Sequence, residues 1–197
     1  MIKQKLKAPR RKRRDFAPDG SKFRKSKILK NEAVEAIIGG LKQAGINFIS
    51  LLPDSDFIEA QKAVTEDKSF TCVPVRNEAI GIGVCAGAWL GGKKPALLIT
   101  TDAILAGAFS LAVLNMQKNI PVLMVIPYRG AFGDGVWFMN AFNLTTEPIL
   151  RDLQVSYTIV KEVDDIVTAI KQGQVSAEAW LRPTAVLLAG GIIFEEA

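Results

Sequence analysis

PVRNEAIGIGVCAGAWLGGKKPALLITT, residues 74–101, is the stretch of sequence that decides the fold. It places Glu78 between an apolar strand pattern and a helix pattern rich in glycine and alanine, and a second apolar strand pattern follows from Pro95. Strand, helix and strand in this order are typical of a parallel sheet with helical crossovers. A carboxyl group buried at Glu78 without a neighbouring cation would hold its proton and shuttle it near neutral pH. The alternative is an exposed glutamate in the first turn of a helix, where the helix dipole favours it.

The same alternation continues along most of the chain. We expect strands at 46–53, 70–75, 95–101, 121–127, 156–160 and 183–190, and helices at 31–44, 57–64, 78–90, 103–118, 145–152 and 164–181. Nearly all the strands are continuous apolar runs, which indicates a sheet covered on both faces. The fold class that we predict is therefore α/β, with an open, doubly wound, mostly parallel sheet of about six strands and helices on both faces.

Composition excludes several kinds of chemistry. The chain has 197 residues, of which 49% are hydrophobic and 23% charged, and this is ordinary for one globular domain. It contains no histidine, which rules out a Ser-His-Asp triad, a Cys-His pair and a histidine-rich zinc site. Cys72 and Cys85 are too far apart for a Cys-x-x-Cys motif, and we expect reduced core cysteines in a cytoplasmic protein. Residues 95–117 include polar side chains, so a membrane span is not expected.

The positive net charge is concentrated at the N-terminus. Residues 1–30 hold 13 Lys and Arg against two Asp, a net +11, whereas residues 31–197 hold 12 against 18 acids, a net −6. We predict a basic, disordered tail at 1–30 and a folded domain at 31–197. The tail is interpreted as a solubilising or subunit-docking extension. The alternative is binding to nucleic acid or an anionic membrane, but the folded domain shows no basic face.

Candidate ligand contacts follow the strands of the predicted sheet. In doubly wound sheets, ligands bind outside the carboxyl ends of the strands. The loops at this edge are 53–56, 76–78, 100–103 and 128–134.

The spacing around Glu78 resembles a known family. Gly83, Gly87 and Pro95 follow it by five, nine and seventeen residues, with Trp89 and Leu90 in between. This arrangement is similar to the pyrimidine-binding domain of thiamine-diphosphate-dependent 2-oxoacid decarboxylases. Within that family, GIGVCAGAWLGGKKPALL is most similar to the sulfopyruvate decarboxylase alpha subunits and the phosphonopyruvate decarboxylases. The resemblance covers about residues 33–188 in the order of the elements, and 73–101 and the LLPDS turn carry it.

The resemblance implies a role for Glu78. In the family, a glutamate at this position hydrogen-bonds the aminopyrimidine ring of thiamine diphosphate, so that the cofactor removes its own thiazolium proton and attacks a 2-oxo acid. Thr101 and Asp102 are candidate cofactor contacts, although several relatives carry histidine or glutamine there. The resemblance thus implies a carboxy-lyase subunit with Glu78 as the catalytic residue.

The substrate contacts implied by the resemblance lie in the LLPDS turn. Ser55 corresponds best to a polar side chain that relatives place against the substrate, and Asp54 could serve instead. The alternative for both is capping of the next helix. Arg76 or Arg129 could neutralise an anionic, sulfopyruvate-like substrate, but a lone loop arginine is more often a surface or interface residue.

The sequence lacks the second half of the family's cofactor site. The family holds the diphosphate and Mg²⁺ with a Gly-Asp-Gly stretch and a distant asparagine. Here Asn140 follows Gly133-Asp134-Gly135 too closely, so we interpret these three residues as a turn. We therefore expect a hetero-oligomer in which a beta-type subunit brings the diphosphate and Mg²⁺ site.

Two other classes of function are weighed against this one. The first is a non-catalytic α/β binding or regulatory module with a basic, anion-binding tail, to which the absence of histidine lends some support. The second is a nicotinamide-dependent oxidoreductase. It rests on Gly81, Gly83 and Gly87, whose spacing is wrong for a dinucleotide fingerprint and which we expect to allow close helix packing.

Overall fold

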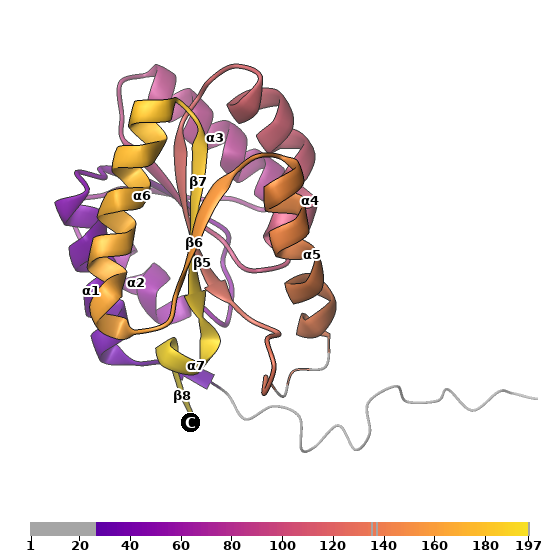
Figure 1. The fold of residues 1–197 in the computed structure, drawn as a ribbon. Helices are drawn as coiled ribbons and strands as arrows, with labels where there is room; N and C mark the ends of the chain where they lie inside the picture. The colour runs from indigo at the N-terminus through magenta and orange to yellow at the C-terminus, as the bar shows by residue number, and fades with distance from the viewer. Residues whose placement is uncertain (1–26, 135, 137, 197) are drawn as a thin grey trace, which may run out of the picture.

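A six-stranded parallel sheet forms the centre of the molecule (Figure 1). The computed structural model describes residues 27–134, 136 and 138–196. The strands of the sheet are β2 (Phe48–Leu51), β3 (Thr71–Pro74), β4 (Pro95–Leu98), β5 (Val122–Tyr128), β6 (Ser156–Val160) and β7 (Pro183–Ala189). Their order is β3-β2-β4-β5-β7-β6, and every neighbouring pair is parallel. The predicted doubly wound sheet is confirmed.

Helices cover both faces of this sheet, which appears edge-on in Figure 1. One face carries α1 (Asn31–Gln43), α2 (Ile58–Glu66) and α6 (Ile166–Trp180), and a short 3-10 helix, η2 (Val163–Asp165), precedes α6. The other face carries α3 (Glu78–Leu90), α4 (Ala103–Ser110), the π-helix η1 (Leu111–Met116) and α5 (Met139–Asp152). Neighbouring strand residues point to opposite faces, so that Leu97 packs in one apolar cluster and Leu98 in the other.

Helix α5 is longer than the sequence predicts. We expected a short helix at 145–152, but the helix begins six residues earlier, at Met139. Met139 is buried, and the side-chain amide of Asn143 donates a hydrogen bond of 3.0 Å to the carbonyl oxygen of Arg129. These contacts hold the first turns against the end of β5. They join segments that are distant in the sequence, so a local pattern does not reveal them.

The ends of the folded part also differ from the prediction. Strand β1 (Lys27–Leu29) pairs antiparallel with β8 (Phe194–Glu196), which follows the short helix α7 (Gly190–Ile193). The side chain of Leu29 is buried in the core, so the ordered chain begins before residue 31. Three-residue strands are too short to give a periodic pattern. Residues 1–26 of the predicted tail lie outside the described residues.

The predicted helix at 103–118 also changes character along its length. It is α-helical only to Ser110 and continues as the π-helix η1. Both segments present the same kind of residues, apolar and without charge, so composition does not mark the transition.

The strand order creates a switch point between β2 and β4. After β2 the chain turns to β3 on one side, and after β4 it turns to β5 on the other. The following helices, α2 and α4, lie on opposite faces of the sheet. Ligands in such folds bind in the crevice outside the carboxyl ends of the strands at this point. Among the described helices, none has the length and apolarity needed to cross a membrane.

The loop after β5 depends on a glycine. Gly130 has φ +83°, and a Cβ atom built on it would lie 2.1 Å from the backbone oxygen of Met139. Gly133 in the same loop has φ +90°, but a Cβ atom there would meet nothing within 4 Å. Both glycines adopt a left-handed backbone, and only Gly130 also lies against another backbone segment.

We predict that Gly130→Ala destabilises the protein by about 3 kcal/mol, because left-handed strain adds to a backbone clash. Gly133→Ala is the matched control and should cost about 1 kcal/mol from backbone strain alone. Urea unfolding of both variants measures the difference. Equal losses of unfolding free energy would show that the close approach to Met139 does not constrain the loop.

Candidate active site at the carboxyl edge of the sheet

Glu78 is the first residue of α3, as the sequence predicts. The helix is capped by Asn77, whose side-chain oxygen accepts hydrogen bonds from the backbone N–H groups of Ala79 (2.8 Å) and Ile80 (3.4 Å). The Glu78 side chain is half-buried rather than buried, and it makes no hydrogen bond or ion pair with another residue that the structure describes. Its carboxyl group is therefore available to an external partner at the positive end of the helix dipole.

Glu78 stands where α3 and α4 approach each other closely. A Cβ atom built on Gly107 of α4 would lie 2.6 Å from Cδ1 of Ile82 and 3.8 Å from Cβ of Glu78. The missing side chain at Gly107 thus permits the two helices to meet beside Glu78.

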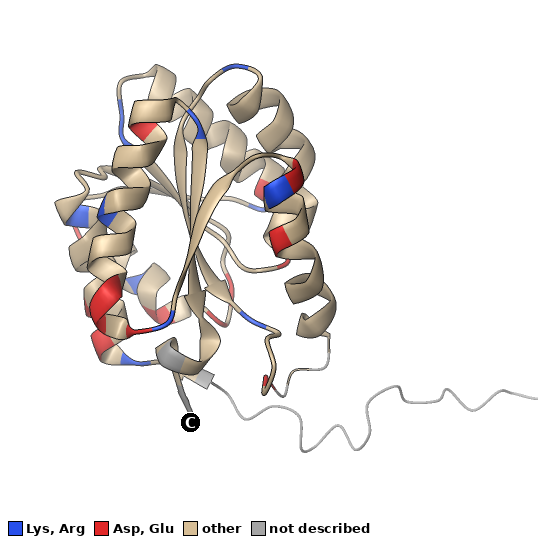
Figure 2. Ribbon diagram, in the orientation of Figure 1, with Lys and Arg blue, Asp and Glu red and all other residues tan. Residues whose placement is uncertain are grey.

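An uncharged helical surface begins at Glu78. It is the one charged residue in the sequence of α3, α4 and η1, and the upper part of α3 that is visible in Figure 2 is tan throughout. These helices expose four large apolar side chains, which we name the α3/α4 surface: Ile80, Leu90, Leu105 and Phe109. The Phe109 side chain is 79% exposed. Exposed apolar groups gathered on packed helices are typical of a protein–protein interface.

The turn after β2 has a different role from the predicted cap. Helix α2 follows Phe57 and receives no side-chain cap, so neither Asp54 nor Ser55 caps it. Instead, Oδ1 of Asp54 accepts a hydrogen bond of 2.6 Å from the backbone N–H of Asp56, and the Asp54 N–H donates to Oε1 of Gln61 at 3.1 Å. Burial raises the pKa of Asp54, and the negative charges of Asp56 and Asp102 raise it further. Ser55 is exposed.

The two residues after β4 are held by different contacts. The buried Thr101 hydroxyl donates to the carbonyl oxygen of Pro127 at 2.8 Å and accepts from the backbone N–H of Arg129 at 2.9 Å. Thr101 therefore ties the end of β4 to the end of β5. Asp102 is half-buried beside the first turn of α4, where its Oδ1 accepts a hydrogen bond from the Thr100 hydroxyl.

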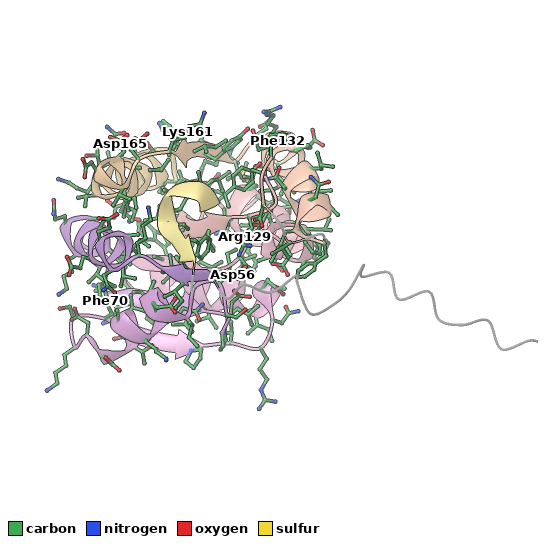
Figure 3. All side chains as sticks on the ribbon, turned by 90° about the horizontal axis from the view of Figure 1, so that it is seen from below. Asp56, Phe70, Arg129, Phe132, Lys161 and Asp165 are labelled. Atoms are coloured by element: carbon green, nitrogen blue, oxygen red, sulfur yellow. The ribbon has the colours of Figure 1, made fainter. Side chains whose placement is uncertain are left out.

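Arg129 is enclosed by two carboxylates. Its side chain is 2% exposed, with Nη1 2.7 Å from Oδ2 of Asp56, Nε 2.7 Å from Oδ2 of Asp134 and Nη2 3.0 Å from Oδ1 of Asp134. Its guanidinium carbon lies 4.8 Å from the centre of the Phe194 ring. Figure 3, seen from below, places Arg129 and Asp56 near each other at the middle of this edge. Arg129 is thus a buried residue that holds other segments of the chain together, whereas Arg76 is exposed.

Residues 131–134 form a turn, in which the backbone N–H of Asp134 donates a hydrogen bond of 2.9 Å to the carbonyl oxygen of Ala131. The turn was predicted at 133–135; Gly133 and Asp134 belong to the observed turn, and Gly135 lies outside the described residues. The Asp134 carboxylate also accepts hydrogen bonds from the backbone N–H groups of Gly130 (2.9 Å) and Val136 (3.1 Å). The Arg129 guanidinium and these two N–H groups outweigh the effect of burial and hold the pKa of Asp134 at about 2.

The structure therefore brings Asp54, Asp102 and Arg129 together at the switch point, and places Glu78 on the same edge at the start of α3. Sequence reasoning missed Asp56 and Phe194 as partners of Arg129. An acidic turn after one buried strand and an arginine after another were the signal that could have suggested the first pair. Within the described residues, no group of three or more His, Cys, Asp or Glu is placed to hold a metal ion.

Comparison with solved structures agrees with the fold. A 2-oxoglutarate:ferredoxin oxidoreductase from Magnetococcus marinus, solved with 2-oxoglutarate, coenzyme A and succinyl-CoA bound, superposes with a TM-score of 0.65 at 21% sequence identity. The match covers 86% of this chain and 30% of that one. At this identity the likeness concerns the fold.

Sequence comparison identifies the family, although no protein-family profile matches the chain. The sulfopyruvate decarboxylase subunit alpha of Methanococcus maripaludis is 28% identical over 156 residues, which are 79% of this chain and 93% of the relative. The corresponding subunit of Methanothermobacter thermautotrophicus is 31% identical over 129 residues, which are 66% of this chain and 78% of the relative. The chain belongs to the family of sulfopyruvate decarboxylase alpha subunits.

Proposed function

We propose that this chain is the alpha-type subunit of a two-chain, thiamine-diphosphate-dependent decarboxylase of a small 2-oxo acid, with an anionic substrate such as sulfopyruvate. Its relatives are named as alpha subunits, which supports a second type of chain in the enzyme. The observation that carries the proposal is the Glu78 carboxyl group, which has no partner among the described residues and borders the uncharged α3/α4 surface.

The surroundings of Glu78 fit the aminopyrimidine of thiamine diphosphate. A carboxyl group at a helix N-terminus that has no partner among the described residues can exchange a hydrogen bond with a ring nitrogen. A partner that covers the α3/α4 surface would exclude water and complete the burial of Glu78, which strengthens this bond. When bound, thiamine diphosphate supplies the nucleophilic carbon and the electron sink for loss of carbon dioxide. Glu78 would then hold a proton at the ring nitrogen.

The carboxyl edge of this chain is a poor site for the diphosphate. Asp54, Asp56, Asp102 and Asp134 lie there with Arg129, which two of these carboxylates already neutralise. A diphosphate brought to this edge would meet a net negative charge. We therefore place the diphosphate and Mg²⁺ on a beta-type partner. In this assignment Asp54 and Ser55 contact the 2-oxo acid at its carbonyl group, while the anionic groups of the substrate face cations away from these carboxylates, and Asp102 borders the cofactor. Arg76 has the exposure needed to reach an anionic group, whereas Thr101 acts by fixing the strand ends.

The proposed role of Glu78 can be tested by substitution. In the assembled complex, Glu78→Gln should lower kcat for decarboxylation by about 10²–10⁴-fold, because glutamine cannot exchange a proton with the cofactor. Carbon dioxide release from sulfopyruvate, with thiamine diphosphate and Mg²⁺ present, measures the effect, and circular dichroism checks the fold.

The control is Glu32→Gln, which changes another glutamate in the first turn of a helix, the exposed Glu32 of α1. This variant should retain the activity of the wild type. Full turnover by the Glu78→Gln complex would show that Glu78 takes no part in the reaction. A wild-type complex that releases no carbon dioxide from any 2-oxo acid would favour the non-catalytic module instead.

The proposed partner contact of the α3/α4 surface can be tested in the same way. Phe109→Ser should weaken binding of the beta-type partner by at least about tenfold, since truncation of an aromatic anchor in an interface costs roughly 1–2 kcal/mol or more. Because Phe109 is exposed in the single chain, the melting temperature of that chain should not fall. Isothermal titration calorimetry with the purified partner measures the affinity.

Val175→Ser is the matched control, because Val175 is 67% exposed on α6, which covers the opposite face of the sheet. Its affinity for the partner should equal that of the wild type. If Val175→Ser weakens the complex and Phe109→Ser does not, the partner lies on the other face.

A further inference from the structure

Arg129 connects three segments that meet at the carboxyl edge of the sheet. It follows β5, forms an ion pair with Asp56 in the turn after β2 and a two-bond ion pair with Asp134 in its own loop, and lies against the ring of Phe194 in β8. A bidentate arginine–carboxylate pair fixes direction as well as distance. The Asp134 carboxylate therefore fixes the orientation of the guanidinium group, and in this orientation Nη1 faces Asp56.

The turn that Arg129 reaches is the one that carries Asp54. The backbone N–H of Asp56 donates a hydrogen bond of 2.6 Å to Oδ1 of Asp54, while the Asp56 side chain points to Arg129 at 2.7 Å. Asp56 thus bonds to Asp54 through its backbone and to Arg129 through its side chain. Gln61 fixes the start of the turn, since its side chain accepts from the Asp54 N–H at 3.1 Å and donates to the Leu52 carbonyl at 2.7 Å.

We propose that Arg129 is a positioning residue, which acts through Asp56 to set the place and orientation of the Asp54 carboxyl group at the switch point. The inference rests on the proposed function in so far as Asp54 contacts the 2-oxo acid. It gives Arg129 a role other than the binding of substrate.

Direct binding of substrate by Arg129 conflicts with its surroundings. The side chain is 2% exposed and each of its three nitrogen atoms already faces a carboxylate oxygen. A substrate carboxylate would have to displace Asp56 or Asp134 and leave it buried without a cation, which is costly. Arg76, in contrast, is exposed on the loop before α3.

The charges that face Asp54 make its position measurable. Burial raises its pKa, the hydrogen bond from the Asp56 N–H lowers it, the negative charges of Asp56 and Asp102 raise it, and Arg129 lowers it. Asp56→Asn removes one negative neighbour and frees the turn from Arg129. Loss of the negative charge lowers the pKa of Asp54, whereas loss of the hydrogen bond raises it, so the hydrogen bond at the amide of residue 56 is the decisive readout.

Asp56→Asn is also the mildest way to break the connection. The variant keeps the size of the side chain and leaves Arg129 paired with Asp134, so the folded state should persist. Asp67→Asn is the matched control, because it breaks an ion pair of 2.6 Å with Lys42 between α2 and β3, at the opposite edge of the sheet.

The first test is an NMR titration of the full chain with ¹³C-labelled aspartate. In the wild type and in Asp67→Asn, the amide proton of residue 56 should follow the titration of the Asp54 carboxyl group to which it is bonded. In Asp56→Asn, the amide proton of residue 56 should no longer follow the titration of Asp54, because the freed turn does not keep the hydrogen bond. An unchanged amide response would show that Asp56 affects Asp54 only through its charge, and would overturn the inference.

The second test uses the assembled complex. Asp56→Asn should raise KM for the 2-oxo acid about tenfold, while the affinity for thiamine diphosphate stays within about twofold of the wild type. Asp67→Asn should change neither quantity. Equal KM values for the two variants would show that the Arg129–Asp56 pair is a structural contact only and does not position Asp54 for the substrate. Loss of activity in the wild-type complex would count against the proposed function, and the NMR titration would still decide whether Arg129 positions Asp54.

Discussion

The constraint that links the fold to the proposed chemistry is the Glu78 carboxyl group, which has no partner among the described residues and lies at the border of an uncharged helical surface. Glu78 begins α3, and the sequence of α3, α4 and η1 then continues without another charge. Covering the exposed Phe109 and Leu105 would stabilise the protein, and we propose that the partner that covers them also encloses Glu78. In this proposal assembly and the chemistry of Glu78 are linked, because the carboxyl group would become buried only when the second chain is in place.

The second constraint is the charge balance at the carboxyl edge. Asp54, Asp56, Asp102 and Asp134 surround a single buried arginine, and the neutralisation that Arg129 provides is used within the chain. The edge is thus rigid and negative, and it suits hydrogen bonding to a substrate better than it suits a phosphate. We therefore propose a division of roles, in which this chain supplies carboxyl groups and a partner supplies the cations.

Local sequence patterns were sufficient for the sheet and for the start of α3. The helix was predicted to begin at Glu78 because an apolar strand pattern and a small-residue helix pattern lie on either side of it. The start of α5 and the β1–β8 pair were missed, since contacts between distant segments stabilise them. The sequence indicated Arg129 as a candidate cation but not its burial, because its partners Asp56 and Phe194 are far from it in the sequence. A periodicity describes one element at a time, and the partners of a buried charge are decided by how the elements pack.

The most direct measurement of the central claim is an experimental structure of the assembled complex with thiamine diphosphate and Mg²⁺. The account predicts that a carboxyl oxygen of Glu78 lies within about 2.6–3.2 Å of a nitrogen of the aminopyrimidine ring. It also predicts that the α3/α4 surface is covered by the chain that holds the diphosphate. A cofactor bound elsewhere, with Glu78 still facing solvent, would contradict the account.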